Sequence, residues 1–112
     1  MRLKKIATRV FAMFYAYLVK RKVKSFIKPL KVNGLSYVSR KTILGKNVNF
    51  NGIRISGCGT VTIGDNFHSG KDCLMISENH NFNNGSKIPY DNTYICKDIT
   101  IENNVWIGDR VI

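Results

Sequence analysis

This 112-residue chain contains two histidines, His68 and His80. Imidazole is the side chain best suited to proton transfer near neutral pH. His80 lies in a polar stretch beside Glu78 and Asn79, and His68 directly follows Phe67. An imidazole can act as a general base on an attacking hydroxyl group. A histidine in a polar loop is also a common surface residue, so residue type alone leaves both interpretations of His80 open. We predict that His68 is exposed to solvent.

The cysteines give less support for thiol or metal chemistry than the histidines give for proton transfer. The three cysteines, Cys58, Cys73 and Cys96, show no CxxC spacing. An odd number excludes a complete disulfide framework, and the spacing does not match a zinc site. We therefore predict reduced thiols in a cytoplasmic protein and no bound metal.

The first 32 residues form a basic segment that differs from the rest of the chain. They hold ten of the 18 Lys and Arg residues and no acidic residue, so most of the formal net charge of +11 lies here. Apolar residues recur at steps of three and four from Leu3 to Leu30, which predicts an amphipathic helix over residues 1–32. Its charge and aromatic face favour contact with an anionic membrane surface.

Other interpretations of this helix remain open. It could pack on the body or on a neighbouring subunit, or its lysines could bind nucleic-acid phosphates, but no known reader motif is present and we predict no nucleic-acid partner. The apolar run 6–19 is interrupted by Arg9 and is shorter than the roughly 20 residues of a membrane-spanning helix. The lysines that follow it are unlike a signal-peptide cleavage site.

Residues 33–112 contain a repeated five-residue phrase, which occurs at 44–48, 63–67, 101–105 and 107–111. Each copy reads aliphatic, Gly or Glu, polar, Asn or Arg, then Val or Phe. Apolar residues also recur at steps of six in three series: Ile55, Val61, Phe67 and Cys73; Ile95, Ile101 and Ile107; Ile99, Val105 and Val111.

A step of six predicts short strands joined by tight turns, with three strands in one triangular coil. Because a single coil cannot bury its aliphatic face, coils must stack. A β-sandwich is the alternative, but it does not impose a step of six. We therefore predict a mainly β chain in which an N-terminal helix precedes a parallel β-helix of about three coils over 33–112.

The repeat is interrupted over about 77–97. This segment carries His80, Tyr90 and Tyr94, and we predict that it leaves the coils as an extruded loop. Loops of this length in compact repeats are often functional.

The ordered motifs resemble the hexapeptide-repeat acyltransferase family. The residues that carry the resemblance are 60–66 (Thr-Val-Thr-Ile-Gly-Asp-Asn), 77–82 (Ser-Glu-Asn-His-Asn-Phe), 88–90 (Ile-Pro-Tyr) and 104–108 (Asn-Val-Trp-Ile-Gly). They look like the maltose and galactoside O-acetyltransferases and the bacterial sugar and capsule O-acetyltransferases. The resemblance implies a left-handed parallel β-helix and a homotrimer. It also implies that acetyl-CoA, the acyl donor, meets a sugar or polysaccharide acceptor between subunits.

The resemblance also implies roles for single residues. His80 stands at the position of the catalytic general base, and no cysteine has to be a nucleophile. The positions implied for coenzyme binding are Trp106, Gly108 and Asp109, and those implied for acceptor binding are Asn79 and Tyr90. Asp109 replaces a serine that is frequent in similar enzymes, and Trp106 could equally pack between subunits.

Two features depart from the family pattern. The sequence ends at Ile112 within a coil, which suggests a C-terminally truncated member, and Gly57–Gly59 stand where galactoside enzymes have an acceptor carboxylate. We predict an acyl-CoA-dependent O-acetyltransferase of a sugar or cell-surface polysaccharide precursor, located in the cytoplasm and peripheral at the inner face of the plasma membrane. The alternative is a catalytically inactive β-helix that binds a partner or a membrane.

Overall fold

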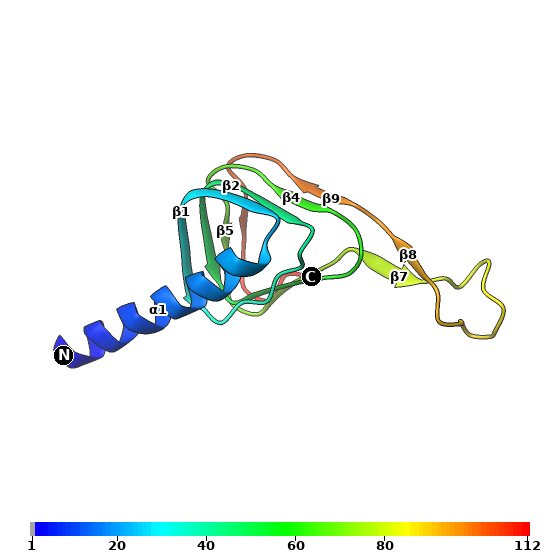
Figure 1. The fold of residues 1–112 in the computed structure, drawn as a ribbon, viewed down its shortest axis with the longest axis horizontal. Helices are drawn as coiled ribbons and strands as arrows, with labels where there is room; N and C mark the ends of the chain where they lie inside the picture. The colour runs from blue at the N-terminus through cyan, green and yellow to red at the C-terminus, as the bar shows by residue number, and fades with distance from the viewer. Residues whose placement is uncertain (1) are drawn as a thin grey trace.

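The computed structural model describes residues 2–112 and shows one N-terminal helix followed by short strands, so the chain is mainly β as predicted (Figure 1). Helix α1 spans Arg2–Lys22. The strands are β1 (Ser25–Gly34), β2 (Thr42–Asn51), β3 (Ile53–Ser56), β4 (Val61–Ile63), β5 (His68–Ser69), β6 (Cys73–Ile76), β7 (Glu78–His80), β8 (Tyr94–Cys96), β9 (Ile99–Ile101) and β10 (Trp106–Ile107).

Helix α1 is attached to the body by its C-terminal half. Ala16 and Val19 are buried there, whereas the N-terminal half extends away from the coils (Figure 1). The last turn of α1 contains three cations, Lys20, Arg21 and Lys22. They interact favourably with the negative, C-terminal end of the helix dipole. Within residues 2–112, no helix is both long and apolar enough to cross a bilayer.

The helix predicted to continue to Leu30 was wrong, because residues 25–34 form strand β1 instead. Leu30 and Val32 are buried while Lys31 between them is exposed, a strand alternation that covers the first coil. Strand β1 pairs in parallel with β2. Pro29 lacks a backbone N–H, so it is tolerated in an outer strand but disfavoured inside a helix.

Parallel pairing between strands one coil apart holds the body together. Thr42 of β2 pairs with Val61 of β4, which pairs with Ile99 of β9, and Ile53 of β3 pairs with Cys73 of β6. Equivalent residues are 19 or 20 positions apart, or 38 where the projecting segment intervenes. The result is a curled parallel sheet, as expected for stacked coils.

The predicted inward series forms the core. Ile55, Val61, Phe67 and Cys73 are each at most 2% exposed. The equivalent side chains of the outermost coil are less buried, since Ile101 and Ile107 are only half-buried. Stacking therefore buries the aliphatic positions, as the step of six requires.

Asparagines form a ladder along one corner of the coils. Asn47, Asn66 and Asn104 all have positive φ angles of 58–63°. The amide Nδ2 of Asn47 donates to Oδ1 of Asn66 at 3.0 Å, and Nδ2 of Asn66 donates to Oδ1 of Asn104 at 2.9 Å. Asparagine suits this corner because it tolerates left-handed backbone and pairs with its own kind.

The glycine of the repeated phrase is required by the close approach of the next coil. A Cβ atom on Gly45 would lie 2.7 Å from the backbone carbon of Gly64. The carboxylate of Asp65 fills this space and accepts a hydrogen bond from the Lys46 backbone N–H at 2.8 Å. The phrase therefore combines a small residue with an acceptor from the neighbouring coil.

Strands β7 and β8 form an antiparallel arm that projects from the coils on the side away from α1 (Figure 1). The arm spans Glu78–Cys96, close to the predicted excursion at 77–97. His80 pairs with Tyr94 in its register. The interruption in the repeat thus corresponds to a defined hairpin with a loop at its tip.

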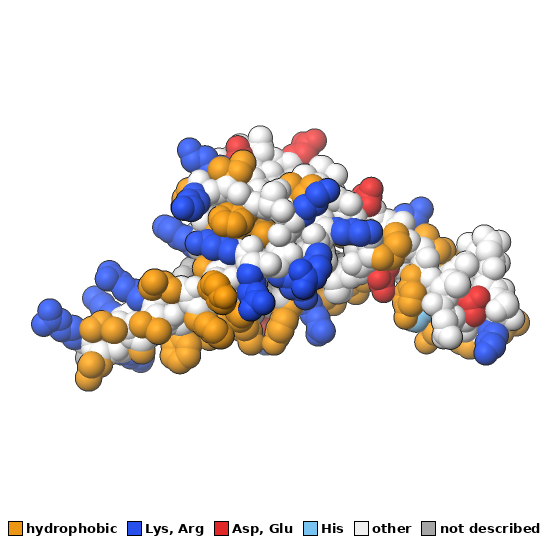
Figure 2. All heavy atoms as spheres, in the orientation of Figure 1, with side chains coloured by type: hydrophobic (Ala, Val, Ile, Leu, Met, Phe, Trp, Pro, Cys, Tyr) orange, Lys and Arg blue, Asp and Glu red, His pale blue; other side chains and the backbone are white. Residues whose placement is uncertain are grey.

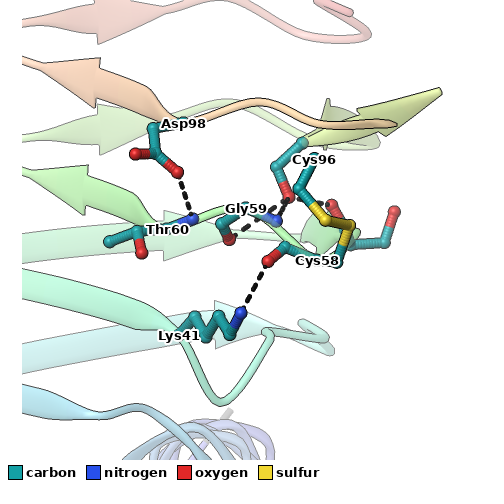
Figure 3. Close-up of a disulfide and its surroundings, with 8 residues drawn as sticks. Lys41, Cys58, Gly59, Thr60, Cys96 and Asp98 are labelled. Atoms are coloured by element: carbon teal, nitrogen blue, oxygen red, sulfur yellow. Dashed lines mark hydrogen bonds between the residues drawn. A yellow bond between two sulfur atoms is a disulfide. The ribbon is translucent and has the colours of Figure 1, made fainter. Parts of the chain in front are cut away.

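The prediction of reduced thiols was wrong for two of the three cysteines. Cys58 and Cys96 form a disulfide with a Cα–Cα distance of 5.2 Å (Figure 3). Stacking brings them together because Cys58 lies at a corner of one coil and Cys96 lies where the arm returns to the next coil. Cys73 is free and buried, and its S–H donates to the Gly108 carbonyl at 3.0 Å.

Candidate active site on the projecting arm

The imidazole of His80 contacts two tyrosine rings of the arm. Its centroid is 3.6 Å from that of Tyr90, with the planes 16° apart, and 5.0 Å from that of Tyr94. Tyr94 is held across the hairpin by β7–β8 pairing, whereas Tyr90 reaches the ring from the tip loop. The aromatic contacts fix the plane of an otherwise mobile side chain.

The Nδ1 atom of His80 is buried and has no hydrogen-bond partner among residues 2–112. Burying a polar atom without a partner is unfavourable by about 1–3 kcal/mol. Such atoms are rare in folded proteins and are concentrated where a group serves function. The ring is thus positioned by stacking, and its Nδ1 is left without a hydrogen-bond partner among residues 2–112.

Asn79 contributes to the backbone of the arm. Its Oδ1 accepts a hydrogen bond from the backbone N–H of His80 at 2.8 Å. This bond fixes the chain at His80 and does not reach the imidazole. Of the two residues predicted to contact an acceptor, Tyr90 therefore stacks on the imidazole, whereas Asn79 binds only the backbone of His80.

The base of the arm is fastened by Ser77, which the sequence analysis did not single out. Its hydroxyl is buried, donates to the Ser56 carbonyl at 3.0 Å and accepts from the Gly59 backbone N–H at 3.1 Å. The Lys97 backbone N–H donates to the Ser77 carbonyl at 2.8 Å. The two strands of the arm thus leave the coils through one hydrogen-bonded junction.

The disulfide reinforces the same junction. Figure 3 shows Cys58 linked to Cys96, with the Lys41 ammonium donating to the Cys58 carbonyl at 2.9 Å. Two residues further along the chain from each cysteine, the Asp98 carboxylate accepts a hydrogen bond from the Thr60 backbone N–H at 2.9 Å. The sequence signal for this pairing was a separation of 38 residues, which equals one coil repeat plus the arm.

The tip of the arm is organised by Asp91. Its carboxylate accepts hydrogen bonds from the Thr93 hydroxyl, and from the backbone N–H groups of Ser86 and Thr93 at 2.9 and 2.8 Å. These bonds, that from the Thr93 hydroxyl first, hold the pKa of Asp91 well below its usual value. The loop that carries Tyr90 is therefore closed by an ionised carboxylate.

The three predicted coenzyme residues lie in the last coil and not on the arm. Trp106 is 74% exposed on β10, where it pairs in register with His68. Asp109 accepts the Lys71 backbone N–H at 2.8 Å, so its carboxylate has a structural role. A Cβ atom on Gly108 would meet nothing within 4 Å.

His68 is exposed, as predicted, and its Nε2 lies 3.1 Å from the Asn51 amide nitrogen. Within residues 2–112, no group of three or more His, Cys, Asp or Glu side chains is arranged to hold a metal ion.

The comparisons with known proteins contribute no relative. No family model, no curated protein and no solved structure matches this chain.

Proposed function

We propose that this chain is an acyl-CoA-dependent O-acetyltransferase with His80 as general base, acting on a hydroxyl group of a sugar or cell-surface polysaccharide precursor. One observation carries the proposal: an imidazole is stacked on one tyrosine ring and contacts a second on an arm that leaves a curled parallel sheet. The motif resemblance supplies the reaction class, and the geometry of His80 is what that class needs.

Acyl transfer from a thioester to a hydroxyl group forms an ester bond and breaks the carbon–sulfur bond. The hydroxyl oxygen attacks the acyl carbon as its proton leaves, and the coenzyme departs as a thiol. His80 would accept the hydroxyl proton and pass it to the departing sulfur. The stacked Tyr90 keeps the ring in one orientation during both proton transfers.

The proposal includes the finer features of the fold. We take the curled parallel sheet to be a left-handed β-helix, with the chain acting as a homotrimer. Trp106 and Gly108 are proposed to line the coenzyme groove, and the high exposure of Trp106 supports a role at a surface. Asp109 is proposed to act indirectly, by fixing the neighbouring turn through its bond to the Lys71 backbone. Lys71 and Arg110 lie near it and could supply the cations that bind the coenzyme phosphates.

The proposed location is the cytoplasm, at the inner face of the plasma membrane, where the chain would use an acyl-CoA donor. Disulfides are uncommon in reducing compartments, so the redox state of Cys58 and Cys96 in cells tests this location directly. A disulfide that persists in freshly lysed, alkylated cells would contradict the cytoplasmic assignment.

The test of function is acetyl transfer by the chain with acetyl-CoA and a panel of sugars, followed by release of the free thiol. His80→Ala is expected to lower kcat by about 10²- to 10⁴-fold, the range for loss of a general base. His68→Ala is the matched control, because it removes the other histidine from an exposed position away from the arm. Equal turnover by His80→Ala and the unchanged chain would refute the assignment.

Acetyl-CoA binding separates the enzyme from an inactive binding protein. Saturable binding with turnover supports the proposal, whereas absence of both, at concentrations far above those of a typical KM, contradicts it. Trp106→Ala should weaken binding without changing the folded structure, because the indole is 74% exposed.

A further inference from the structure

Helix α1 has an apolar surface that the body of the protein does not cover. Seven of its large apolar side chains are each more than half exposed, between 53% and 82%. They are Leu3, Ile6, Val10, Phe11, Met13, Phe14 and Tyr17. At about 100° per residue they fall in one arc, opposite Ala16 and Val19, which pack on the coils.

Most cations of α1 border this apolar arc. Arg2, Lys4, Lys5 and Arg9 lie along the projecting half, and Lys20, Arg21 and Lys22 lie in the last turn. Residues 2–22 contain no acidic side chain. In Figure 2 the hydrophobic side chains follow the lower edge of the helix, while Lys and Arg lie mainly above them and at the free end.

A groove of about 700 Å³ runs between α1 and β1 beside the arc. Arg9, Lys20 and Lys31 line it, and Met13 and Leu30 supply apolar wall. Three cations beside an apolar surface match a phosphate group attached to hydrocarbon.

We propose that α1 docks on an anionic lipid bilayer and lies parallel to its surface, with the apolar arc among the upper acyl chains. The flanking cations then meet lipid phosphates, and the groove accepts a headgroup at the edge of the contact. Amphipathic helices with basic flanks bind in this way, with the apolar face about 5–10 Å deep. The proposal does not depend on acyl transfer.

Charge argues against a second copy of the chain as the occupant. Two α1 helices would bring seven cations against seven without an acidic residue between them. Residues 33–112 carry eight basic and seven acidic residues, so the body of another copy offers no net negative surface. An anionic bilayer supplies both the apolar medium and the opposite charge.

The test is co-sedimentation of the full chain with phosphatidylglycerol–phosphatidylcholine vesicles and with vesicles of phosphatidylcholine alone. We expect binding to the anionic vesicles and at least tenfold less binding to the neutral ones. Raising the ionic strength from about 0.1 M to about 1 M shortens the screening length from about 10 Å to about 3 Å and should weaken binding.

Variants separate the apolar arc from the charges. Tyr17→Ser should weaken binding severalfold, and Val10→Ser with Phe14→Ser at least tenfold. Tyr37→Ser is the matched control for Tyr17, since both rings are 56% exposed and lie near an arginine, Arg54 at 5.7 Å and Arg21 at 5.9 Å.

Neutralisation variants test the cations in the same assay. Lys4→Gln with Lys5→Gln should weaken binding about tenfold or more. The control pair Lys46→Gln and Lys97→Gln removes two exposed cations from the body and should leave binding unchanged.

Three results would overturn the proposal. The first is no binding of the full chain to anionic vesicles, and the second is equal binding by the arc variants with native circular dichroism. The third is a chain that self-associates through α1, with Val10→Ser and Phe14→Ser abolishing that association while no vesicle binding is seen.

Discussion

The imidazole of His80 lies almost flat against the phenol ring of Tyr90, with centroids 3.6 Å apart and planes 16° apart. The two residues are ten positions apart, on opposite sides of the arm tip. Tyr90 therefore controls the orientation of His80 without being adjacent in the chain, and the tip loop becomes part of the candidate site.

Loss of the Tyr90 ring should impair catalysis through the orientation of His80. We expect Tyr90→Ala to lower kcat about tenfold, since stacking of aromatic rings contributes about 0.5–1.5 kcal/mol. Tyr90→Phe keeps the stacked ring and should retain kcat. If Phe and Ala at position 90 were equally impaired, the hydroxyl group and not the stacking would be the functional part of Tyr90.

The arm tip should loosen in acid. The pKa of Asp91 is lowered in the folded protein, first by the Thr93 hydroxyl and then by the Ser86 backbone N–H. A lowered carboxyl pKa contributes stability that is fully present above the unfolded value of about 3.9 and is lost as pH falls through the folded value. The protection factors for amide hydrogen exchange at residues 86–93, which correct for the intrinsic pH dependence of exchange, should therefore fall below about pH 4.

Asp91→Asn is the variant that checks this cause. It removes the charge while keeping the size of the side chain, so the protection factors at the tip should be low already at neutral pH and should not fall further in acid. Asp98→Asn is a control on the coils, because Asp98 binds the Thr60 N–H away from the tip. Acid-induced loosening that persists in Asp91→Asn would show that another group titrates.

Reduction of the Cys58–Cys96 disulfide should destabilise the protein. The bond closes a loop spanning 38 residues, for which chain-entropy arguments give about 2–4 kcal/mol in the free energy of unfolding. Urea unfolding with and without a reductant measures this difference. The double variant Cys58→Ser/Cys96→Ser should lose the response to reductant, and an unchanged response would mean that the reductant acts elsewhere.

Two variants of Asn66 should separate the contributions of backbone preference and hydrogen bonding to the stability of the asparagine corner. Asn66 has φ of 58° and bonds to Asn47 and Asn104. Asn66→Gly keeps the left-handed backbone and loses both amide bonds, at about 0.5–1.5 kcal/mol each. Asn66→Ala adds about 1–2 kcal/mol for a left-handed alanine. Equal stability of the two variants would remove the backbone argument.

Periodicity allowed much of the body to be predicted from the residues. The six-step series Ile55 to Cys73 is buried throughout, because a strand-and-turn unit of constant length puts every sixth side chain on the same inner wall. The break in the series also located the arm. Residues 23–30 were assigned to a helix, because their apolar spacing fits both periods and only pairing with β2 selects the strand.

The sequence by itself determined the step of six, the basic N-terminal helix and the polar excursion that carries His80, because these depend on local periodicity and composition. Tertiary structure decided which distant groups meet. Stacking of coils brought Cys58 to Cys96, and folding of the tip around Asp91 brought Tyr90 onto His80. Such contacts depend on the register between coils and on the path of a loop, and neither is encoded by the spacing of residues along a single strand.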